Sequence, residues 1–108
     1  MHDQHGPCLQ ACNDCAAACD HCAISCLNEP EPRAFKSCAK ATLDCAAVCR
    51  LVAELIARDS RFTREMYLVC AHVCDATAAE CEKHSVDHCQ VSAEICRACA
   101  DECRRMAG

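Results

Sequence analysis

The sequence predicts an all-α protein, an antiparallel up-down-up-down four-helix bundle with a cysteine-lined lumen. Three observations lead to this fold. Cysteine recurs at intervals of four and three residues along four segments, which is the spacing that coiled coils use for buried positions. The segments are rich in alanine, and the whole chain of 108 residues has only 2 glycines and 3 prolines. The connections between them are short, so successive helices should run antiparallel.

Three breaks divide the chain into four expected helices in a single domain, residues 1–108. The first helix, about 7–27, contains "CLQACNDCAAACDHCAISC" and ends at the two prolines of "NEPEP". The second, about 33–57, ends at "RDS", and the third, about 61–83, ends at "HSVD". The fourth helix is expected at about 87–106.

Heptads laid on these helices place every cysteine on the inward-facing stripe. The sixteen cysteines are Cys8, Cys12, Cys15, Cys19, Cys22, Cys26, Cys38, Cys45, Cys49, Cys70, Cys74, Cys81, Cys89, Cys96, Cys99 and Cys103. Thr42, Thr77 and Ser92 fill three gaps in the stripes. Because these residues are small and hydroxylic, they suit a lumen that holds ions better than a packed apolar core.

Composition and charge exclude several classes of protein. A formal net charge of −5 argues against a nucleic-acid partner, and no apolar run approaches the roughly 20 residues of a membrane-spanning helix. The start, "MHDQHGPC", has no apolar segment of a secretory signal. We therefore expect a cytoplasmic protein, and in that reducing compartment many cysteines indicate metal rather than disulfides.

The spacing of the thiols favours Cu(I). Side chains four residues apart on a helix have Cβ atoms about 5–6 Å apart, and two metal–sulfur bonds span about 4.6 Å. Each of six CxxxC pairs can therefore hold a soft monovalent ion between its sulfurs. One Cu(I) for each thiolate also cancels the charge, whereas four zinc ions on sixteen thiolates would leave buried negative charge. We expect the cofactor to be multiple Cu(I) ions and the protein to be no enzyme, and its alanine-rich helices should fold without metal.

Two other functions remain open on these residues. One is zinc or cadmium buffering in the manner of metallothionein. The other is a redox-responsive, cysteine-rich structural protein whose thiols pair on oxidation. Thiol counting and metal competition would separate both from copper storage. Iron–sulfur ligation fits less well, because its CxxC clusters usually come from loops, and here they lie inside helices.

The two ends of the bundle should differ. One end carries apolar residues such as Val52, Ile56 and Phe62, and we expect it to be closed; His5, Met66 and Met106 near this end are weaker candidate ligands. At the other end His84 and His88 are candidates for the site where metal enters, since imidazole binds copper well. We expect His21 and His72 on the surface and His2 in a mobile terminus.

The motifs "CNDCAAACDHCAISCL", "DCAAVCRL", "CAHVCDATAAECEKH" and "DHCQVSAEICRACADECRRM" resemble the bacterial copper storage proteins, in particular their cytosolic branch. The resemblance covers about Cys8 to Met106. It implies a bundle whose luminal cysteines bind many Cu(I) ions, with His84 and His88 as ligands where metal enters. It also implies a homotetramer, with copper ions and a copper chaperone or small chelating thiol as partners. Relatives often carry cysteine at the positions of Thr77 and Ser92, which implies a slightly lower capacity here.

Overall fold

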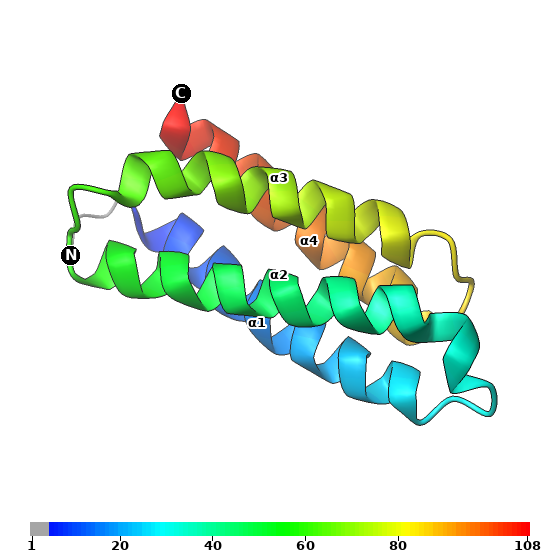
Figure 1. The fold of residues 1–108 in the computed structure, drawn as a ribbon. Coiled ribbons are helices and arrows are strands. Elements are labelled where there is room, and N and C mark those ends of the chain that lie inside the picture. The colour runs from blue at the N-terminus through cyan, green and yellow to red at the C-terminus, as the bar shows by residue number, and fades with distance from the viewer. Residues whose placement is uncertain (1–4) are drawn as a thin grey trace.

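A computed structural model describes residues 5–108 and shows four long α-helices (Figure 1). They are α1 (Gly6–Leu27), α2 (Lys36–Ala57), α3 (Thr63–Cys81) and α4 (Asp87–Ala107), and a short 3-10 turn, η2 (Pro32–Phe35), precedes α2. His2 lies outside the described residues. None of the helices combines the length and the apolar character that crossing a membrane requires.

The helices follow the predicted order, and three boundaries differ from the prediction by two residues or more, including the end of the third helix at Cys81 rather than at 83. Residues 33–35 belong to η2 instead of α2, because Pro32 starts a tighter turn there. The third helix begins at Thr63 rather than at 61. Asp59 has a φ of 53°, and Ser60 then accepts the N–H groups of Phe62 and Thr63. These bonds hold the chain in a turn until Thr63.

Each helix packs against two neighbours, so the bundle is closed around a central lumen. Helix α1 contacts α2 and α4, and α3 contacts the same two helices from the other side. The start of α1 and the end of α4 lie beside the α2–α3 connection, while the α1–α2 and α3–α4 connections lie together at the opposite end (Figure 1). The two ends of the lumen are therefore built from different segments.

Buried alanines repeat every seven residues beside the cysteine stripe. They are Ala16 and Ala23 in α1, Ala39, Ala46 and Ala53 in α2, Ala71 and Ala78 in α3, and Ala93, Ala100 and Ala107 in α4. A methyl side chain at an interface lets two helices approach closely, because the interaxial distance depends on the side chains at the contact. The alanine heptads thus narrow the lumen enough for thiols on different helices to touch.

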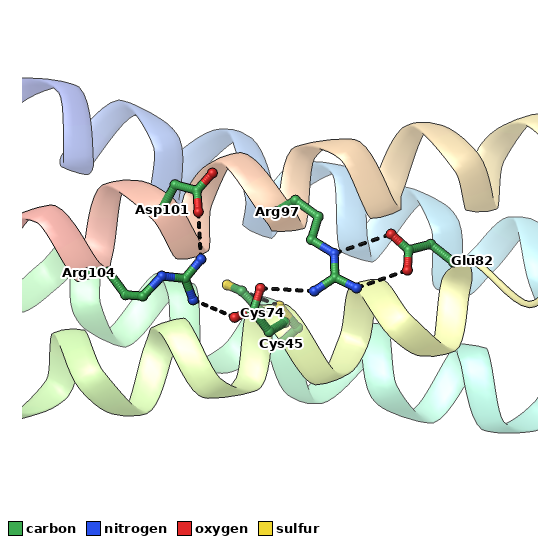
Figure 2. A network of polar contacts seen from close by, with 7 residues as sticks. Cys45, Cys74, Glu82, Arg97, Asp101 and Arg104 are labelled. Carbon is green, nitrogen blue, oxygen red and sulfur yellow. Dashed lines mark hydrogen bonds and ion pairs between the residues drawn. The ribbon is translucent and has the colours of Figure 1, made fainter.

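An exposed ion-pair network joins α3 to α4 outside the lumen. The Arg97 guanidinium donates to Asp75 at 3.1 Å and to Glu82 at 2.9 Å, and Arg104 pairs with Asp75 and Asp101. Figure 2 shows Arg97 and Arg104 reaching toward α3 at the level of Cys74. Because solvent screens these pairs, they fix the position of α4 on α3 more than they stabilise the fold.

The alanine spacing makes a prediction for the second helix. Ala46→Leu should destabilise the metal-free, reduced protein by about 1–3 kcal/mol, since a larger side chain must force α2 away from its neighbour. The free energy of unfolding is measured by urea denaturation followed by far-UV circular dichroism. Ala47→Leu, one position along on the exposed face, is the matched control and should change stability by less than about 0.5 kcal/mol.

Equal effects of the two substitutions would contradict this account of the alanine interface. A metal-free protein without helical dichroism would contradict the expectation that the bundle folds before it binds an ion.

Candidate metal centre

All sixteen cysteines point into the lumen, and none has exposed surface. All are free thiols in the structure. Their sulfurs approach one another both along a helix and between helices: Cys15 lies 4.0 Å from Cys19 and 3.9 Å from Cys45, and Cys19 lies 3.5 Å from Cys96. The lumen is therefore filled by sulfur atoms in mutual contact.

Four sets of four cysteines have all their sulfurs within 4.8 Å of one another. The sets are Cys12, Cys70, Cys99 and Cys103; Cys15, Cys49, Cys74 and Cys99; Cys15, Cys19, Cys45 and Cys96; and Cys22, Cys26, Cys38 and Cys89. Cys15 and Cys99 each belong to two sets, so neighbouring sets share ligands. Cys8 and Cys81 adjoin them, with Cys8 at 3.9 Å from Cys103 and Cys81 at 3.5 Å from Cys38. Such shared thiolates can bridge several soft ions.

One histidine reaches the thiols from the end of the lumen formed by the α1–α2 and α3–α4 connections. The Nδ1 atom of His88 lies 3.3 Å from the sulfur of Cys22 and 3.6 Å from that of Cys89. Its Nε2 atom lies 2.6 Å from a carboxylate oxygen of Glu29. The carboxylate therefore orients the ring so that Nδ1 faces the sulfurs, an arrangement common among metal-binding histidines.

Glu29 contacts the ring of His88 at this site, and sequence reasoning missed it. It belongs to the "NEPEP" connection and lies 59 positions from His88 along the chain, so no local spacing links the two. Phe35 was missed as well, and its ring stacks on the imidazole of His84 with ring centroids 4.6 Å apart. Only the packing of the α1–α2 connection against the start of α4 reveals these partners.

The thiols near His88 titrate differently from an isolated cysteine. Burial raises the pKa of the Cys26 and Cys89 thiols above its ordinary value. Hydrogen bonds from Cys38 and Cys81, with a further contribution from His88, lower the pKa of Cys22. Burial acts to lower the pKa of His88, but hydrogen bonds to Cys22 and Glu29 outweigh it and raise this pKa. The Cys22–His88 pair thus favours a thiolate beside an imidazolium.

The other candidate ligands make different contacts. His84 is half-buried and stacks on Phe35, and among residues 5–108 no thiol contact is found for its ring. At the opposite end His5 Nδ1 and the Tyr67 hydroxyl form a hydrogen bond of 2.9 Å. Met66 and Met106 are half-buried and pack against the core. Among these candidates, the structure thus shows a ring nitrogen within 3.6 Å of cysteine sulfurs for His88.

The end expected to be closed by apolar residues is in fact partly polar. Val52 and Ile56 are buried there as expected, but Phe62 is 54% exposed. A cavity of about 410 Å³ opens at this end, and its lining includes His5, Tyr67, Arg61, Arg64 and Arg105. The α2–α3 connection, the start of α3 and the end of α4 bring these arginines together at the end of the bundle, which the heptad pattern could not show.

Comparison with known proteins agrees with this geometry. The family model described as copper storage protein matches residues 1–108. The chain belongs to the copper storage protein family. A cysteine-rich protein of Bacillus subtilis (strain 168), YhjQ, described as uncharacterized, is 41% identical over 107 residues, which are 99% of each chain.

Solved structures of copper storage proteins share the fold. The Cu(I)-bound copper storage protein BsCsp3 is 39% identical with a TM-score of 0.95, over 98% of this chain and 100% of that one. A cytosolic copper storage protein from Streptomyces lividans, loaded with five coppers, is 35% identical with a TM-score of 0.93, over 97% of this chain and 92% of that one. The resemblance seen in the cysteine motifs is thereby confirmed, and so is the four-helix bundle.

The contact between His88 and Glu29 makes a prediction about pH. Glu29→Gln should lower the pKa of His88, because an amide no longer stabilises the charged ring. The shift is measured by NMR titration of the His88 imidazole in the reduced, metal-free protein. The raised pKa of His88 also affects the stability of the fold. The charged ring adds its full contribution to the free energy of unfolding below the ordinary histidine pKa of about 6.5, and this contribution is lost as pH rises through the pKa of His88 in the folded protein.

Glu31→Gln, in the same connection, is the matched control and should leave the His88 titration unchanged. If both substitutions shift the His88 pKa equally, the general charge of the connection is responsible and the specific contact is not.

Proposed function

We propose that this protein stores Cu(I), holding multiple ions on the sixteen luminal thiolates. The observation that carries the proposal is the clustering of the sulfurs in four sets within 4.8 Å, without any exposed thiol. Membership of the copper storage family supports it, as do the Cu(I)-bound and copper-loaded relatives. All sixteen cysteines are the proposed ligands.

Charge balance favours Cu(I) over zinc in this lumen. Among residues 5–108 the buried polar side chains are Thr42, Thr63, Thr77 and Ser92, so apart from the partly buried His88 beside Cys22 no side chain in the lumen offers a cation to the thiolates. One Cu(I) for each thiolate leaves the lumen neutral, whereas zinc held by four thiolates leaves two negative charges for each ion. Buried charge without a partner costs several kcal/mol for each ion. Softness points the same way, because thiolate ligands select Cu(I).

The role is one of storage without catalysis. The sulfurs contact one another at 3.5–4.0 Å, which leaves no space between them for an organic substrate. A cytoplasmic location is part of the proposal, supported by the description of the Streptomyces lividans relative as cytosolic. A copper chaperone or a small chelating thiol would supply the metal.

Metal enters, in this proposal, at the end of the lumen that carries His88. The His88 side chain is 14% exposed, and it joins solvent to the sulfurs of Cys22 and Cys89. His84 stands beside it at the same end and is the second residue proposed to bind incoming metal. His5, Met66 and Met106 at the other end are weaker candidates.

A homotetramer is the proposed assembly. Ile24 and Leu68 on the outer faces of α1 and α3 are 57% and 59% exposed, and Ile95 on α4 is half-buried. Such apolar side chains can be covered by further copies of the chain.

The storage function is tested by an anaerobic titration of the reduced protein with Cu(I) in competition with a chromophoric chelator. The expected result is a break at about one copper for each thiol, because thiolate charge sets the capacity. A break at one to four coppers per chain, or complete loss of copper to the chelator at once, would point to zinc buffering or a redox role.

A denatured sample of the demetallated protein provides the control. Sixteen free thiols would exclude structural disulfides, whereas fewer would favour the redox-responsive alternative.

A further inference from the structure

The sulfur contacts divide the sixteen cysteines into two separate groups. The inner group has eleven members, Cys8, Cys12, Cys15, Cys19, Cys45, Cys49, Cys70, Cys74, Cys96, Cys99 and Cys103. The mouth group has five, Cys22, Cys26, Cys38, Cys81 and Cys89. Across the described residues, no sulfur–sulfur contact and no set of four joins the two groups.

A layer of hydroxyl side chains lies between the groups. Thr42, Thr77 and Ser92 come from α2, α3 and α4, and they are 0%, 2% and 0% exposed. Along its helix each of them stands between a cysteine of the inner group and one of the mouth group, as Thr42 does between Cys45 and Cys38. We name these three residues the hydroxyl layer.

Two of these hydroxyls donate to backbone carbonyl oxygens, and the third lies beside a sulfur. Thr42 donates to the carbonyl oxygens of Cys38 and Ala39 at 2.8 and 3.0 Å, and Thr77 donates to the carbonyl oxygen of Ala41 at 3.3 Å. Ser92 Oγ lies 3.9 Å from the sulfur of Cys19. Ser92 therefore contacts the inner group from the level between the two groups, because along α4 it stands between Cys89 and Cys96.

A neutral hydroxyl is a poor bridge for Cu(I). Bridging between soft ions depends on thiolate, while oxygen donors suit harder metals. Helix α1 has no hydroxyl at this level, but Cys19 and Cys22 on successive turns face different neighbours. Cys19 contacts Cys15 and Cys96, whereas Cys22 contacts Cys89 and His88.

We propose that the hydroxyl layer separates the lumen into two copper stores, an inner store of eleven thiols and a mouth store of five thiols with His88. This inference rests on the proposed storage of Cu(I). Charge balance gives the stores capacities of about eleven and five ions. The mouth store exchanges copper with solvent through His88, whereas copper in the inner store must cross a level without bridging ligands. The inner store therefore releases copper more slowly.

The experiment is removal of copper from the fully loaded, reduced protein by excess chelator, followed over time by absorbance. The native protein should release copper in two phases, with amplitudes of about five and eleven ions per chain. Cys38→Ser should reduce only the fast amplitude, and Cys74→Ser only the slow one. The two stores would be overturned if the native protein released copper in a single phase or with a different division of amplitudes. They would also be overturned if Cys38→Ser reduced the slow amplitude or Cys74→Ser reduced the fast one.

Position 92 gives a matched pair of variants. Ser92→Cys adds a thiol beside Cys19, at the level between the two groups, so it should merge the two phases into one and raise the capacity by about one ion. Ser92→Ala removes the hydroxyl without adding a ligand and should keep both phases. Two phases in Ser92→Cys, or one phase in Ser92→Ala, would contradict the role of the layer.

Failure of this inference is distinguishable from failure of the storage function. A total of about sixteen ions released in one phase leaves storage intact and removes only the division. A total of four ions or fewer contradicts storage itself.

Discussion

The close approach of four helices around a column of thiols is the constraint on which the structure depends. Alanine at every seventh position brings the helices together, and the sulfurs then meet at 3.5–4.0 Å. Thiols at such distances can all be neutral, but they cannot all be ionised unless cations enter with the charge. A lumen without buried cationic side chains therefore calls for about as many positive charges as there are thiolates, and monovalent soft ions meet that need.

The two ends of the lumen differ in the side chains that lie between the buried thiols and solvent. At the His88 end, Glu29 holds the imidazole against Cys22, and a partly exposed ring links solvent to buried sulfur. At the other end, Tyr67 and His5 form a hydrogen bond, and both side chains line a cavity that also contains arginines. The hydroxyl layer lies between the two ends. The two ends of the lumen therefore present different side chains to solvent.

Much of this architecture could be predicted from the sequence, and the reasons are local. A period of 3.5 residues in the cysteines places all sixteen on one face of their helices, and proline or polar residues mark the turns. The pattern also located Thr42, Thr77 and Ser92 in the lumen. It could not show that Glu29 meets His88, that Phe35 covers His84, or that arginines surround the other end. Those contacts join segments far apart in sequence, and the packing of the connections determines them.

The central claim is that Cu(I) replaces the thiol protons one for one and leaves the lumen neutral. A pH-stat titration tests it most directly, by counting protons released against ions bound as Cu(I) in acetonitrile is added anaerobically to the reduced protein. The account predicts about one proton for each copper up to about sixteen of each, since a deprotonated thiolate is the ligand. Release of about four protons for each ion, or binding without release of protons, would contradict it.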